Sequence, residues 1–425
     1  MQALRTRVAG VDVHKEILAI SALVGDADKE PTVEQFSCNT FTEDLMAMGL
    51  ILKERGITEV AMESTGVFWK PVYNVWSKMG IRCTVGNART MRNVPGRKTD
   101  MNDSHWIAQL HRFGLIRASF IPEDKFQQLR LLSRHRTNLT DDLARVKNRV
   151  QRILEDGNIK MGSVVSDVFG VAGLNVLRLL ADGVTTADTL AAKVTTNIKR
   201  KGEIKKSLTN CFTTYHCFLV KELMQQYDDL KARILEVDRK LASEMTPYVH
   251  LIEELKKIPG IDMTLAVGII AEATNDVSNF ADERKFAAWA GVAAGNNESA
   301  GKKKRTKCRE GSPHFRKLLI QAAHGAKLKR GSFYRAKYNK WKFSLGSANK
   351  AKVAIANRIA RVIYKLIAGD KYKELGYMRG DPKEHKIKLL IKQLKNLGVE
   401  VNHHNHQLIT SVRKVKVDTT GITLN

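Results

Sequence analysis

The N-terminal part of the chain alternates short apolar runs with amphipathic segments. The run at residues 7–24 predicts two strands joined by a tight turn near His14–Glu16, and residues 33–40 predict a third strand. Helical and strand patterns then alternate: a helix over 42–55, a buried strand that ends at Glu63, a helix over 67–79, a strand over 81–87 and a helix over 100–114. Three early strands followed by this alternation predict an α/β domain over residues 1–123.

The order of these elements indicates which kind of α/β fold the N-terminal domain has. An antiparallel meander joined by parallel strands is the arrangement of RNase H-like (RuvC-like) domains. We therefore expect a multidomain α/β plus α protein whose N-terminal domain has this fold.

From about residue 124 the pattern changes to long amphipathic helices. Residues 125–156 and 219–245 place apolar side chains at three- and four-residue spacing among many charges. Two such helices predict an antiparallel coiled-coil arm over residues 124–246, a structure that often mediates self-association as a homodimer or homotetramer. Between them, about residues 158–215 form a mostly helical insert to which the sequence assigns no role.

Residues 247–378 predict a mostly helical domain. Residues 251–274 form helix, Pro-Gly turn and helix, in which Gly260 would let backbone amides approach a phosphate; an ordinary helical hairpin is the alternative. Further helices are expected over 283–290, over 313–329 with Ser312 as N-cap, and over 349–368. The tail, 379–425, is basic and weakly periodic.

The charge of the chain indicates a polyanionic partner. Of its 425 residues, 71 are Lys or Arg and 44 are Asp or Glu, which gives a formal net charge of +27. The excess is concentrated in residues 300–352, which hold 17 basic residues and one acid, Glu310. A solvated basic surface is the simpler alternative, but so one-sided a segment favours nucleic acid, because each phosphate contact releases counterions.

Cysteine usage and hydropathy indicate a protein of the cytoplasm. The five cysteines show neither a CxxC pair nor a disulfide-like spacing, so we expect free thiols in a reducing compartment. Cys211 and Cys217 flank His216, which could suggest a metal, but ordinary core or surface positions are the favoured explanation. No signal-peptide pattern and no apolar run of about 18 residues occurs, so no membrane association is expected.

Four acidic residues occupy positions suited to a metal site. Asp12 and Glu63 end two apolar strands, where a charge does not serve packing, and Asp100 and Asp103 share one face near the start of a helix. Acids at helix starts are also common because of the helix dipole. Together, however, the four carboxylates would suit Mg²⁺, and two such ions about 3.5–4 Å apart could stabilise both oxygens of an in-line displacement.

A lysine-rich loop contains a second candidate group, Ser299, in the segment NNESAGKKKR. A serine hydroxyl attacks phosphorus only with help from a base or metal, and the following cations could stabilise the phosphate oxygens. Judged by spacing alone, Ser299 is an ordinary loop serine. No Ser-His-Asp arrangement is evident.

Six motifs resemble, in order, the landmarks of one enzyme family: VDVHKE, MESTG, KTDMNDSHWIA, IPGI, FAAWAGV and ESAGKKK. They resemble the DEDD-type insertion-sequence transposases, the bridge-RNA-guided serine recombinases of the IS-one-ten and IS-eleven-eleven families. The resemblance covers about residues 5–155 and 220–378. It implies a RuvC-like domain joined through a coiled coil to a transposase domain.

The resemblance also implies roles for residues. Asp12, Glu63, Asp100 and Asp103 correspond to the Mg²⁺-binding tetrad, and Ser299 corresponds to the nucleophile that becomes linked to a DNA end. A structured noncoding guide RNA and the target and donor DNA are the implied partners. The candidate nucleic-acid-binding residues are Lys302, Lys303, Lys304, Arg305, Lys307, Arg309, Arg316, Lys317 and Gly260.

The chain departs from the family pattern at three places. Ser104 replaces the usual alanine, Ala293 and Ala294 replace a polar-Pro pair, and the insert is larger. The expected function is a site-specific DNA recombinase and transposase of a prokaryotic insertion sequence. The alternatives are a RuvC-like junction endonuclease that uses water, with Ser299 incidental, and a non-catalytic nucleic-acid-binding protein, which the four retained carboxylates disfavour.

Overall fold

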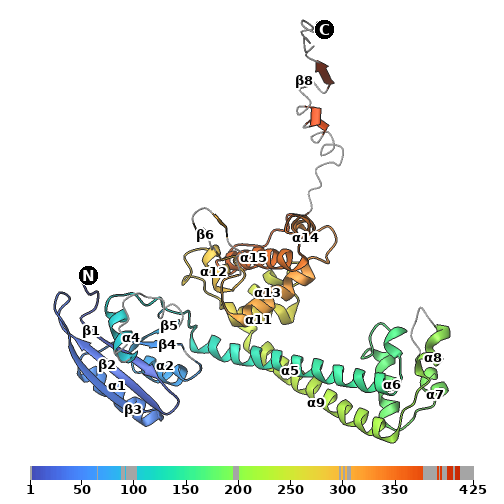
Figure 1. Cartoon of the computed structure of the whole chain (residues 1–425), viewed down its shortest axis with the longest axis horizontal. Coiled ribbons are helices and arrows are strands. Elements are labelled where there is room, and N and C mark those ends of the chain that lie inside the picture. The colour runs from blue at the N-terminus through green and yellow to red at the C-terminus, as the bar shows by residue number, and fades with distance from the viewer. Residues whose placement is uncertain are drawn as a thin grey trace, which may run out of the picture. The chain divides into compact units, whose positions relative to one another are not determined.

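The computed structural model describes residues 2–64, 66–87, 91, 103–194, 201–295, 298–299, 302–303, 308–376, 390–391, 393–394, 400–404 and 407–411. The chain divides into two compact units, Met1–Ile121 and Pro122–Asn425. Figure 1 shows the strands β1–β5 in the first unit and the long helices α5 and α9 in the second.

A mixed five-stranded sheet in the order β3-β2-β1-β4-β5 forms the centre of the first unit. Its strands are β1 (Arg7–Val13), β2 (Ile17–Val24), β3 (Thr32–Asn39), β4 (Glu59–Glu63) and β5 (Arg82–Gly86). The pairs β1/β2 and β2/β3 are antiparallel, and β1/β4 and β4/β5 are parallel. The predicted meander followed by parallel strands is confirmed, and with it the RNase H-like domain.

Helices cover both faces of this sheet. The helices are α1 (Thr42–Glu54), α2 (Trp69–Lys78) and α4 (Asp103–Arg112). The side chains of Val11, Leu45 and Trp76 are buried together in the core between the sheet and helices α1 and α2. On the other face α4 packs against β1, β2 and β4. Strand alternation therefore assigns successive residues of β1 to opposite layers.

The second unit begins with the predicted arm. Helices α5 (Asp124–Asp156) and α9 (Thr214–Glu244) lie side by side (Figure 1), and Arg136 of α5 forms a bidentate ion pair with Asp238 of α9. The insert packs on this helix pair through η1 (Met161–Ser163), α6 (Val171–Ala181), α7 (Ala187–Ala192), η2 (Lys201–Glu203) and α8 (Ile204–Leu208). The arm and the insert therefore share one hydrophobic core.

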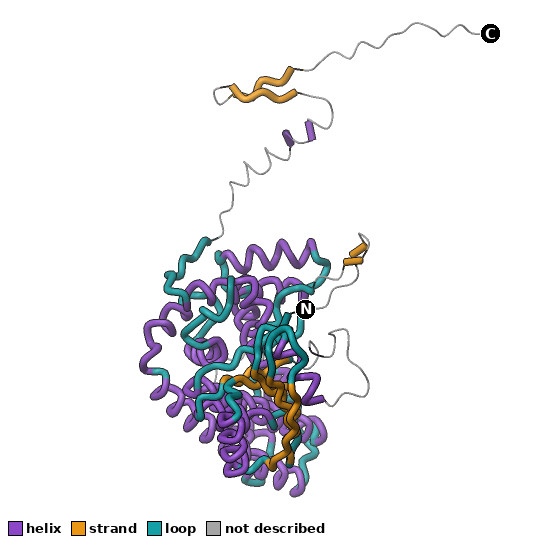
Figure 2. The backbone as a smooth tube through the Cα atoms, turned by 90° about the vertical axis from the view of Figure 1, so that its left-hand side faces the viewer, coloured by secondary structure: helices purple, strands orange, loops and turns teal. Residues whose placement is uncertain are grey.

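A helical domain follows the arm. It comprises η3 (Thr246–Tyr248), α10 (Val249–Lys256), α11 (Met263–Ala273), α12 (Glu283–Trp289), α13 (Pro313–Ala326), α14 (Phe333–Ser344) and α15 (Ala348–Ile367). Figure 2 shows that strands in this part of the described chain are limited to short hairpins. Helix α11 is almost wholly buried, and its Glu272 accepts two hydrogen bonds, of 2.7 and 2.9 Å, from Arg134 of α5. This contact ties the arm to the helical domain.

Most predicted helices are present within a few residues, including Ser312 as the N-cap of α13, with Pro313 in its first turn. Helix α14 was missed, because its many basic and aromatic residues obscure the apolar period, although Ser332 caps it in the usual way. The tail contributes a hairpin of β8 (Glu400–His404) and β9 (Gln407–Ser411) to the described residues. The finer division into four domains stays a prediction.

The cysteines are free, as expected. Burial raises the pKa of the Cys83 thiol to about 12, and burial together with Asp44 raises the pKa of Cys38 to about 11. Both thiols are therefore poor nucleophiles at neutral pH. In the part of the chain that the structure describes, no helix has the length and apolar character needed to cross a membrane.

Candidate active site

Two of the four predicted carboxylates lie at the ends of adjacent parallel strands. Strands β1 and β4 pair with Gly10 opposite Ala61 and Val11 opposite Met62, so the next positions on the two strands are Asp12 and Glu63. Parallel strands that pair in this way end at the same edge of the sheet. The structure therefore brings Asp12 and Glu63 to one edge.

Both carboxylates project from the sheet face that α4 covers. Gly10 and Asp12 share a face of β1, and Ala61 and Glu63 share a face of β4, because side chains alternate along a strand. Ala61 packs with Ile107 of α4, which identifies that face. The Asp12 side chain is 24% exposed, so it is partly covered yet open to a ligand.

Helix α4 approaches the sheet closely because β1 has a glycine at the point of contact. A Cβ atom on Gly10 would lie 2.2 Å from both the Ala108 nitrogen and the Ser104 carbonyl oxygen, closer than atoms can approach. The backbone of the helix therefore rests on the backbone of the strand. Gly10 is two residues from Asp12, so this contact brings α4 close to the predicted site.

A buried hydrogen bond fixes the first turn of α4. The hydroxyl oxygens of Ser104 and of Ser21 on β2 lie 2.8 Å apart, and both side chains are fully buried. Ser21 is paired with Gly10 across the sheet. The helix thus begins, with Asp103, at the sheet edge where β1 and β4 end, and its positive N-terminal dipole points toward the carboxylates.

Helix α4 ends near the opposite edge of the sheet. His111 in its last turn is 2% exposed, and its Nε2 lies 3.8 Å from a carboxylate oxygen of Glu59, at the start of β4. Among the described residues this Nε2 atom has no hydrogen-bond partner. Burial, and secondarily the positive charge of Arg5, lowers the pKa of His111 to about 4, so the imidazole is neutral at physiological pH.

One residue near the carboxylates was not singled out from the sequence. The Nε2 atom of His14, in the turn after β1, lies 3.1 Å from a carboxylate oxygen of Asp12. The turn itself is closed by a hydrogen bond from the His14 backbone nitrogen to the Ile17 carbonyl oxygen, 3.1 Å. The signal that could have identified His14 is its position two residues after the strand-end aspartate.

The donor set fits a hard divalent cation in its chemistry, since it consists of carboxylate oxygens. Asp12, Glu63 and Asp103 are placed on one face and at one edge, whereas Asp100 lies outside the described residues. Within the described residues no three His, Cys, Asp or Glu side chains form a cluster that could hold an ion. The structure therefore places β1, β4 and α4 as a metal site would require, and the coordination of an ion by all four carboxylates stays a prediction.

The predicted nucleophile lies on a short hairpin. Strand β6 (Glu298–Ser299) pairs antiparallel with β7 (Lys302–Lys303), with Ser299 opposite Lys302. At the base of the loop, an isolated bridge joins Ala294 to Cys308. This pairing places Ser299 in the hairpin next to its turn, while Lys304, Arg305 and Lys307 lie outside the described residues.

Comparison with known proteins adds independent information. Residues 9–159 match a transposase family profile for the DEDD domain of IS110 elements, and residues 252–339 match the profile described as "Transposase IS116/IS110/IS902 family". Two distinct profiles in this order, the first over the sheet domain and helix α5 and the second within the helical domain, decide the family. The chain belongs to the IS110 family of transposases. A DEDD domain also implies the use of a divalent metal.

One curated relative is similar over part of its length. The protein named "Putative transposase y4pF/y4sB" from Sinorhizobium fredii (strain NBRC 101917 / NGR234) is 28% identical over 160 residues. The match covers 35% of this chain and 40% of the relative, so the chain spans less than half of that protein. The two IS110 family profiles include all four carboxylates, Gly260 and Ser299, but leave out most of the insert.

Two basic residues predicted to bind nucleic acid in this IS110-family chain have partners within the protein. Lys317 of α13 forms an ion pair of 2.7 Å with Asp141 of α5, and Arg316 donates a hydrogen bond to the Gly291 carbonyl oxygen at the base of the serine loop. Arg309, next to the loop, is exposed. Arg316 thus helps to hold the loop, and a role of these residues toward nucleic acid stays a prediction.

Gly260 in the IPGI motif has a structural explanation. Its φ angle is +87°, a conformation that favours glycine, and a Cβ atom there would lie 2.3 Å from the Ala326 nitrogen. A Cβ atom on Gly325 of α13 would in turn lie 2.7 Å from the Cα atom of Gly260. The glycine therefore allows a backbone-to-backbone contact inside the helical domain, and the predicted contact of this turn with a phosphate stays a prediction.

Proposed function

We propose that the chain is a site-specific DNA recombinase that transposes an insertion sequence by means of a serine nucleophile. The observation that carries the proposal is the placement of Asp12 and Glu63 at adjacent parallel strand ends, on the face where α4 begins with Asp103. This is the geometry in which an RNase H-like domain delivers carboxylates to one point. Its occurrence in an IS110-family chain that also carries Ser299 supports phosphoryl transfer as the chemistry.

In the proposed reaction the Ser299 Oγ attacks a phosphorus atom of a DNA strand. A phosphoserine bond forms, the bond from phosphorus to the 3′ oxygen breaks, and a free 3′-hydroxyl is left. Asp12, Glu63, Asp100 and Asp103 would hold Mg²⁺, which would neutralise charge on phosphate oxygens. In the rejoining step a different 3′-hydroxyl attacks the phosphoserine bond. A phosphodiester bond forms and the serine hydroxyl is released, so no hydrolysis takes place.

The proposed partners follow from charge and from family membership. Target and donor DNA are the substrates, a noncoding guide RNA of the same element selects them, and the α5/α9 arm joins chains into a dimer or tetramer. A charge of +27 supports the polyanionic partners. The reaction would take place in the cytoplasm of a prokaryotic cell.

The covalent intermediate gives the test. Ser299→Ala should abolish SDS-resistant protein–DNA adducts, whereas Ser312→Ala should retain them. Ser312 is a useful control because it lies in the same domain and caps α13 by accepting a hydrogen bond from the Phe315 nitrogen, 3.3 Å. Ser312→Ala removes this helix cap, so the variant tests whether a local structural defect in the domain is enough to remove adducts. Equal loss of adducts in both variants, or loss in neither, would sink the assignment of Ser299 as the nucleophile. Strand cleavage without any adduct would favour a water-using junction endonuclease instead.

A further inference from the structure

Helix α14 presents one aromatic side chain to solvent. Phe343 is 92% exposed, the highest value among the large hydrophobic side chains of the described residues. Tyr334, nine positions earlier on the same helix, is 3% exposed and faces the interior. Nine residues at about 3.6 per turn amount to two and a half turns, so Phe343 lies on the side of α14 opposite to Tyr334. Its exposure therefore follows from the orientation of the helix.

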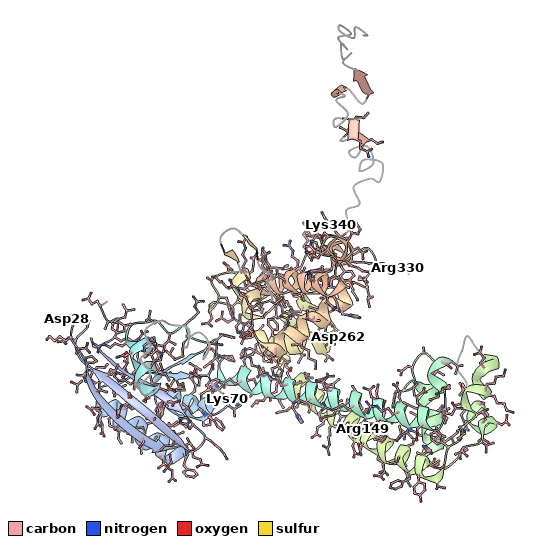
Figure 3. All side chains as sticks on the ribbon, viewed as in Figure 1. Asp28, Lys70, Arg149, Asp262, Arg330 and Lys340 are labelled. Atoms are coloured by element: carbon pink, nitrogen blue, oxygen red, sulfur yellow. The ribbon has the colours of Figure 1, made fainter. Side chains whose placement is uncertain are left out.

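The surroundings of Phe343 are strongly basic. Residues 327–352 contain nine Lys or Arg residues and no acid, and Lys340 and Lys342, close to Phe343 in the sequence, are both exposed. Figure 3 shows Arg330 and Lys340 projecting outward from the helical domain. Glu374 contacts α14 at its first residue, where it accepts a hydrogen bond of 3.0 Å from the Phe333 nitrogen. That contact is about 15 Å along the helix from Phe343.

The inner side of α14 is held independently of Phe343. Ser332 caps the helix, and Arg358 of α15 lies 5.8 Å from the centre of the Phe333 ring. The preceding residue of α15, Asn357, donates a hydrogen bond of 3.3 Å to the Val292 carbonyl oxygen at the base of the serine loop. Adjacent residues of α15 thus contact α14 and the base of the serine loop, so both belong to one packed domain.

We propose that Phe343 stacks on an unpaired base of the DNA substrate while Lys340 and Lys342 contact the neighbouring phosphates. A single exposed aromatic residue is unremarkable, but one placed among cations matches the two chemical features of an unpaired strand, a π face and a polyanionic backbone. Every base offers such a face, so the contact tolerates any sequence. The inference rests on the proposed function in one respect, since the choice of DNA comes from the serine loop in the same domain.

Binding of the full chain to three fluorescent probes in EDTA tests this inference. The probes are a DNA duplex, the same duplex with a central unpaired bubble, and RNA of the bubble sequence. Phe343→Ala should weaken binding to the bubble about ten-fold, in line with loss of one base–aromatic stack, and should change duplex binding less than about two-fold. Phe343→Trp should restore the affinity for the bubble, because the larger ring also stacks.

Phe41 gives a matched control. It is 75% exposed but lies beside the acidic residues Glu43 and Asp44, so Phe41→Ala should leave all three affinities unchanged. The double variant Lys340→Gln/Lys342→Gln should weaken duplex and bubble binding alike. It should also lower the salt dependence of binding, by a slope of about 0.9 for each phosphate that a lysine no longer neutralises.

Three results would overturn the inference: unchanged bubble affinity in Phe343→Ala, an equal loss on duplex and bubble, or a loss confined to RNA. The assay needs no cleavage, so it is separable from the adduct test on Ser299. If Ser299→Ala retained adducts while Phe343→Ala bound the bubble about ten-fold more weakly, the proposed nucleophile would be wrong and the stacking site would stand.

Discussion

The Ser104 hydroxyl on α4 lies 2.8 Å from the Ser21 hydroxyl on β2, and neither side chain is exposed to solvent. The bond joins the first turn of the helix that begins with Asp103 to the sheet that carries Asp12 on the neighbouring strand. It fixes the helix start through a polar contact inside an apolar layer.

Removing one hydroxyl of this pair should be worse than removing both. Ser104→Ala leaves the Ser21 hydroxyl buried without this partner, which should lower the free energy of unfolding by about 1–2 kcal/mol. The double variant Ser21→Ala/Ser104→Ala leaves no buried hydroxyl without a hydrogen-bond partner at this contact. It should therefore recover part of the lost free energy of unfolding. Urea unfolding of the parent, of Ser21→Ala, of Ser104→Ala and of the double variant measures the coupling energy between the two hydroxyls. Strictly additive effects would show that the hydrogen bond contributes nothing to stability.

Gly10→Ala should displace α4 from the sheet. The added Cβ atom would meet backbone atoms of Ser104 and Ala108 at 2.2 Å, and backbone cannot move aside as a flexible side chain can. We expect a loss of about 3 kcal/mol or more and faster hydrogen exchange at the α4 amides. Gly202→Ala is the control, because a Cβ atom there meets nothing within 4 Å. Unchanged exchange in Gly10→Ala would contradict the close packing described for α4.

Hydrophobic periodicity was enough to predict much of the fold. It failed where few apolar residues are buried along an element, and where a contact joins residues that are far apart in the sequence. The strand that ends at Glu63 was predicted because its apolar residues are contiguous and buried on both faces. Helix α14 was missed because only Tyr334 is buried along its length. The role of Gly10 depends on a helix roughly ninety positions later in the chain, about which strand periodicity carries no information. The same holds for the contact of His14 with Asp12, since a turn residue can point in several directions.

His111 should make the N-terminal unit sensitive to mild acid. Its folded-state pKa is lowered from 6.5 to about 4, chiefly by burial, so between these values the unfolded chain binds a proton that the folded chain does not. Stability should therefore fall as the pH drops from about 6.5 to about 4, by about 2–3 kcal/mol in total, and change little from this cause above pH 7. His111→Leu removes the titrating group. Urea unfolding at pH 7 and pH 5 should show a smaller difference for the variant, and an equal difference would assign the acid sensitivity to other groups.

The carboxylates at the strand ends should be required for metal binding as well as for cleavage. Asp12→Asn and Glu63→Gln each remove a charge from the sheet edge without changing side-chain size, and we expect cleavage and adduct formation to fall at least about 100-fold, together with a loss of Mn²⁺ binding measured by calorimetry. His14→Gln tests a positioning role: it should weaken Mn²⁺ binding about 10-fold, as expected for a residue that orients a ligand, and leave folding intact. Asp26→Asn is the matched control, since Asp26 is exposed on the same domain and pairs with Lys29 at 2.9 Å. Asp12→Asn and Glu63→Gln could instead bind Mn²⁺ as tightly as the parent and Asp26→Asn do. In that case Asp12 and Glu63 would not be metal ligands, and the chemistry would have to be assigned to Ser299 alone.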